Sequence, residues 1–184
     1  NSIFLNFRSN SKFMIEKVVM IGAGNVATQL GLAFKAKNIE IIQVYSRKQE
    51  SAKALADKLS TDYTTELAAL KKDADLYVIA VKDTAIQEIL ENLTLADNQL
   101  IVHTAGSVPM SIMEGFTTNY GVFYPLQTFS KERTVDFSSV PICLEAIHPL
   151  VLLKLQELAG KLSGTVRQID SEERKTLHLA AVFV

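Results

Sequence analysis

The most constraining feature of this chain is a glycine-rich turn between an apolar run and a helix-like segment. Residues 17–32 read KVVMIGAGNVATQLGL, in which a strand pattern leads directly into GxGxxA. Gly22 permits the tight turn, Gly24 lets backbone approach a pyrophosphate, and Ala27 lets the helix pack closely on its strand. The free N–H groups and the positive dipole end of such a helix face phosphates. Glycines in such a turn can also serve packing alone, but the strands before and after it favour a dinucleotide site.

The next apolar run, IEIIQVY, is followed by cations rather than by an acid. Ser46, Arg47 and Lys48 come about twenty residues after the glycines, where an NAD-preferring site places a carboxylate for the ribose 2′-hydroxyl. A planar guanidinium and a lysine beside a hydroxyl suit a 2′-phosphate, so these residues predict NADP(H) in preference to NAD(H). Alternatively, Ser46 and Gln49 form a capping box and the cations are solvated, and both interpretations can hold together. Cations in a helix's first turn oppose its dipole, which favours a bound anion.

The composition fits one α/β domain with a fragment of another. The chain has 184 residues, 48% of them hydrophobic, and a net charge of −1. It has no basic run interleaved with aromatic residues, so we expect no nucleic-acid partner, and the pair Lys71-Lys72 is expected to be a solvated surface. Cys143 is the single cysteine, which excludes an internal disulfide and a cysteine-based zinc site, and we expect no metal. Its apolar context, PICLE, predicts a buried thiol.

The ends of the chain differ from its middle. No stretch reaches the roughly 20 apolar residues that span a bilayer, and residues 3–7 are too short for a signal peptide, so we expect a cytoplasmic protein without a membrane partner. Residues 1–13 match no element and are expected to be a leader or a disordered extension. Residues 14–170 are predicted to form a Rossmann-like NADP-binding domain. Residues 171–184 begin like a capped helix and become apolar, which predicts the first helix of a truncated C-terminal helical domain.

Strand and helix patterns alternate along the rest of the chain. The alternation predicts an α/β fold of the Rossmann type, with a doubly wound, mainly parallel sheet of about eight strands. The expected strands are residues 18–21, 39–45, 63–65, 76–81, 100–103, 121–124, 140–144 and 165–169. The expected helices are the one that the glycine turn opens, and residues 47–59, 66–71, 84–92 with a Thr84–Gln87 capping box, 108–113, and 149–162 closed by Gly164.

Polar or small residues follow four of these strands. In such a sheet a ligand binds at the carboxyl ends of the strands, so we expect these segments to converge on the cofactor. The predicted cofactor-binding residues are Gly22, Ala23, Gly24, Asn25, Val26, Ser46, Arg47, Lys48, Ala80, Val81, Lys82, His103, Thr104 and Ala105.

Several of these motifs resemble a known group. The GxGxxA turn, SRK, AVKD and HTAGS resemble the NADP-binding half of the 6-phosphogluconate dehydrogenase-like superfamily, especially pyrroline-5-carboxylate reductase and the coenzyme F420-dependent NADP oxidoreductases. The later segments VFYPLQTFS, PICLE and RKTLHLAAVF resemble bacterial proteins with a Rossmann-like domain followed by an uncharacterised helical domain, commonly labelled NADP oxidoreductases. The resemblance covers residue 17 to the end. It implies a further all-helical domain that forms a homodimer and closes the substrate cleft, and this group has no agreed substrate.

Three residues are candidates for the proton donor or electrostatic clamp that hydride transfer requires. Lys82 follows a strand at the expected crevice, and His103 ends the next strand and could hydrogen-bond the nicotinamide ribose. His178 lies in the helix that, by the resemblance, leads into a further domain and faces the nicotinamide across the cleft, and Leu177, Leu179 and Ala180 are expected to desolvate it. Alternatively, Lys82 is a solvated residue at a strand end. The alternative for His103 is that nearby backbone groups satisfy the hydrogen bonds of its ring. His148, which precedes a proline, is expected to lie on the surface without partners.

The segment YPLQTFS supplies candidates for the substrate side of the cleft. Tyr124, Gln127, Thr128 and Ser130 carry hydroxyl and amide groups after a strand. Alternatively, these groups seal the loop by bonding its own backbone. Glu145, after the next strand, is a weaker candidate for the substrate side, and it has the same alternative of bonding nearby backbone.

Two functions follow from the sequence. The first is an NADP(H)-dependent oxidoreductase that transfers a hydride between the nicotinamide and a small carbonyl or imine substrate. The alternative is a non-enzymatic NADP(H)-sensing module, which the absence of a clear acid–base pair in the sequence permits. Neither the substrate nor the direction of reaction follows from the residues.

Overall fold

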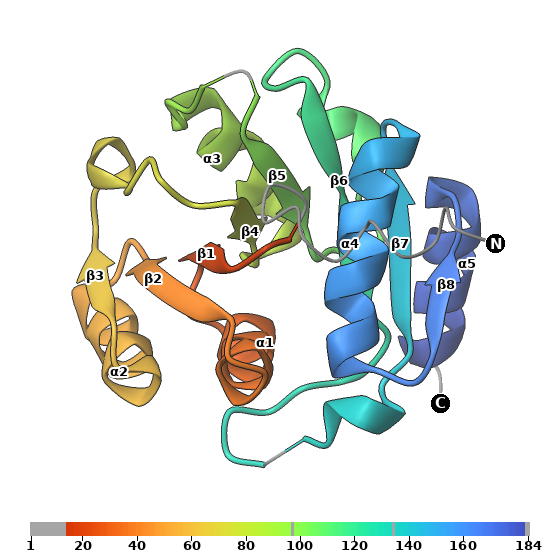
Figure 1. Ribbon diagram of the computed structural model, residues 1–184, viewed down its shortest axis with the longest axis horizontal. Coiled ribbons are helices and arrows are strands. Elements are labelled where there is room, and N and C mark those ends of the chain that lie inside the picture. The colour runs from red at the N-terminus through yellow and green to blue at the C-terminus, as the bar shows by residue number, and fades with distance from the viewer. Residues whose placement is uncertain (1–13, 97, 134, 183–184) are drawn as a thin grey trace, which may run out of the picture.

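A computed structural model describes residues 14–96, 98–133 and 135–182 of the chain. Figure 1 shows one twisted sheet with helices packed against it. The sheet has eight strands in the order β3-β2-β1-β4-β5-β6-β7-β8. The strands are β1 Lys17–Ile21, β2 Glu40–Tyr45, β3 Asp62–Thr64, β4 Leu76–Ile79, β5 Leu100–His103, β6 Asn119–Pro125, β7 Ile142–Ala146 and β8 Val166–Gln168. The α-helices are α1 Asn25–Ala36, α2 Gln49–Leu59, α3 Ile86–Asn92, α4 Pro149–Leu162 and α5 Ser171–Val182.

The strand order contains a reversal of winding direction. From β1 the chain winds outward through β2 to β3, and β4 then pairs with the other side of β1 before β5 and β6 follow. The strands from β3 to β6 are parallel, β7 is antiparallel to β6, and β8 is parallel to β7. The predicted Rossmann-type, mainly parallel sheet is therefore confirmed. The reversal between β1 and β4 is the topological switch point at which such sheets bind ligands.

Both faces of the central strand β1 are buried. Val18 and Met20 pack in one cluster with residues of α1, α2 and α4, while Val19 and Ile21 pack in a second cluster with residues of α3. Successive side chains of a strand point to opposite faces, so a strand covered on both sides is apolar throughout. The helices therefore form a layer on each side of the sheet (Figure 1).

Both predicted capping boxes are wrong. α2 begins at Gln49, with Lys48 in an extended conformation (φ −95°) at its N-cap and no side chain bonded there. Ser46 Oγ instead accepts a hydrogen bond from the backbone N–H of Lys48 (3.3 Å). α3 begins only at Ile86, after a 3₁₀ turn, and Gln87 donates to Glu91 in the next turn of the helix. At α2 the extended Lys48 delays the start of the helix, whereas at α3 the 3₁₀ turn Asp83–Ala85, which contains Thr84, precedes it.

Other differences lie at the ends of elements. The helices predicted for residues 66–71 and 108–113 are 3₁₀ turns over Leu67–Ala69 and Met110–Met113. Gly164 does not close α4: the C-cap is Ser163 in extended conformation, and the Gly164 N–H donates to the Ser138 carbonyl (3.0 Å). The buried thiol is confirmed, because Cys143 is 2% exposed. The prediction for residues 1–13 lies outside the described residues.

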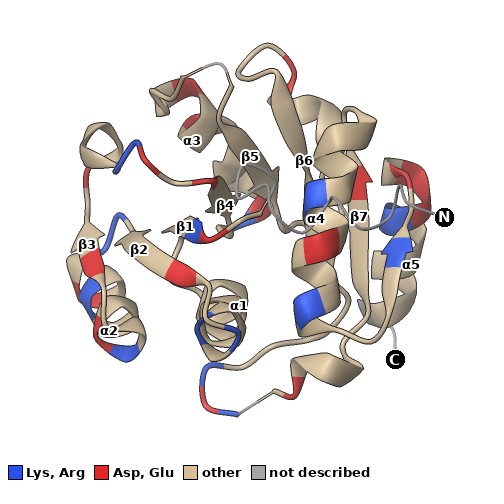
Figure 2. Ribbon diagram, viewed as in Figure 1, with Lys and Arg blue, Asp and Glu red and all other residues tan. Residues whose placement is uncertain are grey.

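Charge is spread over the molecule in small groups of both signs. Figure 2 shows Lys and Arg interspersed with Asp and Glu on the helices and on the edges of the sheet. In the described part of the chain, no helix is long and apolar enough to cross a membrane. The same residues contain no cluster of three potential metal-ligating side chains.

Two leucines of α4 provide a test of the packing. Leu155 is fully buried and Leu153 is 62% exposed on the same helix. We expect Leu155→Ala to lower the free energy of unfolding by about 2–5 kcal/mol through lost burial and a cavity. The control Leu153→Ala should change it by less than about 0.5 kcal/mol. Urea denaturation measures both, and similar losses in the two variants would contradict this arrangement of α4.

Candidate cofactor and catalytic site

The glycine turn after β1 is fixed by a close approach of two backbone segments. Gly22 has φ +124°, and a Cβ atom there would lie 2.2 Å from the carbonyl oxygen of Ala80. The Gly22 N–H donates to the Tyr45 carbonyl (2.8 Å), and the Ala80 N–H donates to Ile21 (2.7 Å). Only glycine satisfies both the positive φ and this contact. The ends of β1, β2 and β4 therefore meet at one point.

Gly24 lies in open space, whereas Gly22 is crowded by the Ala80 backbone. It is the N-cap of α1, and a Cβ atom there would meet nothing within 4 Å. No side chain caps this helix, and its first turn holds no acidic residue. The Thr28 N–H bonds to the Gly24 carbonyl (3.0 Å), so the amides before it have no acceptor within the helix. An open approach to unpaired amides at a helix N-terminus fits an anionic phosphate group.

The four polar segments converge as the sequence predicted. The Ser46 N–H donates to the Thr64 carbonyl (3.2 Å), and the Thr104 N–H donates to the Ile79 carbonyl (3.1 Å). The Ser107 hydroxyl also donates to the Asp83 carboxylate, which joins the loops after β4 and β5. The carboxyl ends of β1, β2, β4 and β5 thus form a continuous edge around the switch point.

Arg47 lies on this edge beyond the end of β2. Its guanidinium pairs with Glu88 of α3 (Nη1 to Oε2, 3.5 Å), and both side chains are more than 60% exposed. Such an exposed pair contributes about 0–1 kcal/mol, so little opposes its exchange for a phosphate. Lys48 is also exposed, and Ser46 is half-buried. Sequence reasoning missed Glu88, because nothing in a surface glutamate signals a partner 41 positions away.

The segment after β4 lies beside the glycine turn. Ala80 is 5% exposed and contacts Gly22, while Val81 is half-buried with its Cγ1 close to the same glycine. Lys82 is exposed at the start of the turn Asp83–Ala85. The first two residues therefore support the turn, and Lys82 lies at the rim of the site.

His103 is fully buried, at 0% exposure. Its Nδ1 accepts a hydrogen bond from the Ala105 N–H (3.2 Å). Burial, and secondarily the Arg174 guanidinium, lower the pKa of His103 to about 4, against smaller opposing effects of the Pro109 carbonyl and Asp83. The ring is therefore neutral at neutral pH and shapes the loop after β5. In this structure it does not reach the surface where a ribose would bind. The backbone satisfies only one side of the ring, because in the described part of the chain His103 Nε2 is buried without a hydrogen-bond partner.

His178 meets Tyr124 on the nearby part of the same edge. Its Nδ1 lies 2.9 Å from the Tyr124 hydroxyl oxygen, and the rings meet edge to face with centroids 5.9 Å apart. A Cβ atom at Gly106 would lie 2.5 Å from the His178 ring, so the ring packs directly on that glycine. The expected apolar neighbours do not cover it, because Leu177 and Leu179 are 40% and 51% exposed.

A buried ion pair holds α5 in place. Arg174 is 1% exposed, pairs with Glu145 of β7, and donates from Nη2 to the Val108 carbonyl (2.7 Å). Ser171 Oγ donates to Glu145 Oε2 (2.8 Å) and accepts from the Met110 N–H (3.0 Å). Glu145 is therefore engaged in anchoring α5 and is not a substrate-lining residue here. Sequence reasoning missed Arg174, because an arginine in the run SEERK is typical of a solvated helix face.

The loop after β6 is tied to α1. Asn25 Nδ2 donates to the Phe129 carbonyl (2.9 Å), and buried Gln29 donates from Nε2 to the Ser130 carbonyl (2.6 Å). The Ser130 hydroxyl accepts from the Glu132 N–H (3.3 Å), so it seals its own loop. The segment YPLQTFS thus lies against the helix whose N-terminus faces the expected phosphates.

The other candidates from this part of the sequence differ in how exposed they are. Gln127 and Thr128 are exposed beside that anchor, whereas the Tyr124 ring is 8% exposed. His148 was expected to have no partner, but its Nε2 lies 3.0 Å from Asn119 Oδ1. That expectation is therefore wrong, and His148 links the start of α4 to β6.

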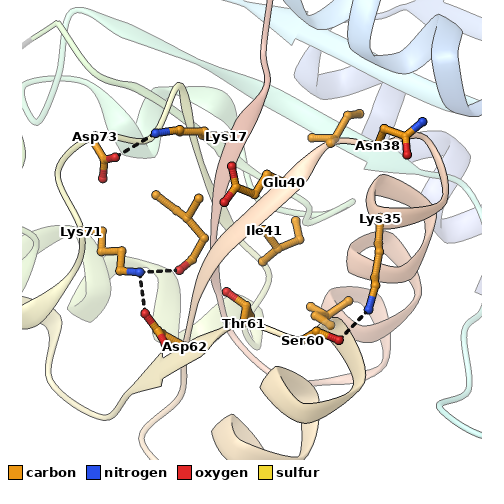
Figure 3. A pocket seen from close by; sticks show the side chains of 13 residues that line it. Lys17, Lys35, Asn38, Glu40, Ile41, Ser60, Thr61, Asp62, Lys71 and Asp73 are labelled. Carbon is orange, nitrogen blue, oxygen red and sulfur yellow. Dashed lines mark hydrogen bonds and ion pairs between the residues drawn. The ribbon is translucent and has the colours of Figure 1, made fainter.

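A cleft of about 670 Å³ lies at the opposite edge of the sheet (Figure 3). Its lining includes the first residues of β1 and β2, far from the glycine turn that follows β1. Lys17 pairs with Asp73 (3.1 Å) and Lys71 with Asp62 (2.6 Å) across it. These charges are mutually satisfied, and none of the predicted site residues lines the cleft.

The fold and the glycine turn define a Rossmann-type nucleotide-binding protein. Residues 17–106 match the family described as NADP oxidoreductase coenzyme F420-dependent, and residues 140–184 match a domain of unknown function, DUF2520. This chain is therefore similar to the first family over residues 17–106 and to the second over residues 140–184. No curated protein matches it.

Solved structures agree with this assignment. A "putative NADP oxidoreductase" from Bacteroides fragilis is 47% identical with a TM-score of 0.86, over 92% of this chain and 66% of that one. A pyrroline-5-carboxylate reductase from Coxiella burnetii (19% identity, TM-score 0.68, 88% and 61% covered) shares the fold. So does an imine reductase variant from Myxococcus stipitatus in complex with NAD⁺ (16%, 0.70, 91% and 59%). The chain spans about two thirds or less of the length of each.

Substitution of the two glycines of the turn should change stability to very different extents. We expect Gly22→Ala to lower the free energy of unfolding by about 2–4 kcal/mol, because its Cβ meets the Ala80 carbonyl at a positive φ. Gly24→Ala is the matched control and should change it by no more than about 0.5 kcal/mol. Chemical denaturation distinguishes them, and equal losses would contradict the close approach at Gly22.

Buried His103 predicts a pH dependence of stability. Its pKa is lowered from 6.5 to about 4 in the folded protein, so the unfolded chain binds an extra proton between these values. The free energy of unfolding therefore falls as the pH is lowered through this window. We expect His103→Gln to remove that part of the slope in urea titrations, and ¹⁵N spectra of the wild-type ring to show it neutral throughout most of the window. A ring that protonates near 6.5 would contradict its burial.

Proposed function

We propose that this chain is the cofactor-binding part of an NADP(H)-dependent oxidoreductase acting on a small carbonyl or imine substrate. The observation that carries the proposal is the open approach at Gly24 to the uncapped N-terminus of α1, at the switch point of the sheet. The family match supports NADP(H), and the shared fold with imine and pyrroline-5-carboxylate reductases supports the reaction class. When bound, the nicotinamide supplies the hydride chemistry.

Different residues of the chain would then bind different parts of the cofactor. The amides around Gly24 would hold the pyrophosphate, and Arg47 with Ser46 and Lys48 would hold the 2′-phosphate beyond β2. The nicotinamide would extend in the other direction, toward the ends of β5 and β6. The expected homodimer through a C-terminal helical domain, and the cytoplasmic location, stay predictions within this proposal.

Arg47 tests the choice of cofactor. Its side chain is 66% exposed, so Arg47→Ala should leave the fold intact. We expect NADPH affinity to fall about 10- to 100-fold while NADH affinity stays nearly constant, since charge-assisted hydrogen bonds to one phosphate are lost. Fluorescence titration measures both. Arg167→Ala, which removes an exposed arginine on β8 at the far edge of the sheet, is the control.

Two outcomes would count against the proposal in different ways. Equal affinity of the wild-type chain for NADPH and NADH, unchanged in Arg47→Ala, would contradict the role of Arg47. Tight NADPH binding by the complete protein with no oxidation by any carbonyl, imine or flavin-like acceptor would favour the sensing module. Steady NADPH oxidation with one acceptor would reject that alternative.

A further inference from the structure

We propose that His178 is the proton donor of this reaction and that Tyr124 and Gly106 are positioning residues for its ring. The inference rests on the proposed function, because it assigns a role beside the nicotinamide. It concerns three residues, from the loop after β5, the end of β6 and the middle of α5, which lie far apart in the sequence.

The three residues form a single packed unit. The Tyr124 hydroxyl oxygen and His178 Nδ1 are 2.9 Å apart, and the tyrosine ring behind them is 8% exposed. The His178 ring itself is half-buried, and in the described part of the chain no group hydrogen-bonds its Nε2. Gly106 admits the ring, because any larger residue would place a Cβ 2.5 Å from Cγ and Nδ1. Nδ1 is thus hydrogen-bonded to Tyr124, and Nε2 is available to a substrate.

The topology places this unit on the nicotinamide side. β1 lies at the centre of the site, and β2 on one side ends in the cations that suit the adenosine 2′-phosphate. A dinucleotide that crosses the switch point then extends past β4 toward β5 and β6. Gly106 follows β5 and Tyr124 lies near the end of β6, so His178 stands where that half of the cofactor ends.

The anchoring of α5 gives the ring a fixed position. Ser171, Arg174 and His178 occupy positions i, i+3 and i+7, which share one face of a helix. The first two bond to Glu145 on β7, so this polar face is turned toward the sheet. His178 lies one turn beyond the buried Arg174 on the same face. A group held by packing and hydrogen bonds on a rigid element is what proton transfer to a bound substrate requires.

The chemistry balances with NADPH as the reductant. At the substrate, a C–H bond forms with the transferred hydride and the π electron pair of C=O or C=N moves onto oxygen or nitrogen. That atom would take the proton from Nε2 of the imidazolium as NADPH gives up its hydride. One H⁺ from bulk solvent would then restore the imidazolium, so each turnover would consume one proton. In this step Nδ1–H would donate to the Tyr124 oxygen 2.9 Å away, and this would fix the tautomer that leaves Nε2 free to exchange its proton. Burial, followed by the nearby Cys143, raises the pKa of Tyr124, so the phenol stays neutral in this role.

Histidine ¹⁵N spectra test the placement without needing a substrate. The chain has 3 histidines, which single His→Gln variants assign. NADP⁺ should shift the His178 ring resonances, whereas 2′-phosphoadenosine 5′-diphosphoribose, which lacks the nicotinamide, should leave them in place. His148, bonded to Asn119 at the first residue of β6, is the internal control and should respond to neither.

Each result decides between the two proposals. Binding of both compounds without a shift at His178, or an equal shift with both, would overturn the role of His178 and leave the proposed function standing. Failure of both compounds to bind would instead refute the proposed function. A shift with NADP⁺ alone supports the assignment.

Tyr124→Phe tests the positioning role, with Tyr120→Phe on the same strand as control. We expect Tyr124→Phe to change the Nδ1 and Nε2 shifts of His178 toward a mixture of tautomers while the NADP⁺ dissociation constant stays within about twofold. Tyr120→Phe should alter neither. With any acceptor that oxidises NADPH, His178→Gln should lower kcat about 10²- to 10⁴-fold without weakening NADPH binding. Unchanged tautomers in Tyr124→Phe, or an unchanged kcat in His178→Gln, would contradict the proposal.

Discussion

The backbone of Gly22 passes the carbonyl oxygen of Ala80 more closely than any side chain would permit. This approach brings β1 and β4 together at the switch point and turns the chain into α1. Because the turn uses no side chain, the first amides of the helix remain open at Gly24. The close packing and the phosphate-binding geometry are therefore two results of one constraint, and the sequence alternatives of packing and binding do not exclude each other.

The other end of the site depends on a buried charge. Arg174 is almost completely buried between β7 and the loop before Met110, where Glu145 and the Val108 carbonyl accept its hydrogen bonds. Desolvation makes such a pair a weak source of stability, but removing either partner would leave an uncompensated charge. Its effect is to tie α5 to β7 and to the Val108 carbonyl through Nη1 and Nη2, while in the described part of the chain the Arg174 Nε has no hydrogen-bond partner. The same charge also helps to keep His103 neutral.

The sequence predicted local features better than contacts between distant elements. The apolar runs of β1 and β4 and the glycine spacing identified the fold, because burial on both faces and the turn geometry leave few alternatives. The capping boxes failed at Ser46 and Thr84, since an extended residue precedes α2 and a 3₁₀ turn that contains Thr84 precedes α3. The role of Arg174 could not be predicted, because its burial depends on a carboxylate 29 positions earlier. The spacing of Ser171, Arg174 and His178 was the one available signal, and it becomes interpretable only when the sheet is known.

The two ends of the site differ in how firmly their side chains are held. At the adenosine end, Arg47 and Glu88 are exposed and weakly paired, so the charge can turn toward a phosphate at little cost. At the other end, Tyr124 and Gly106 hold His178 by packing and a hydrogen bond, so its ring has little freedom. Affinity for a charged group tolerates a mobile partner, because an electrostatic attraction acts over several ångströms. Proton transfer does not, since donor and acceptor must lie within hydrogen-bond distance. The difference in rigidity between the two ends is thus what the proposed division of roles requires.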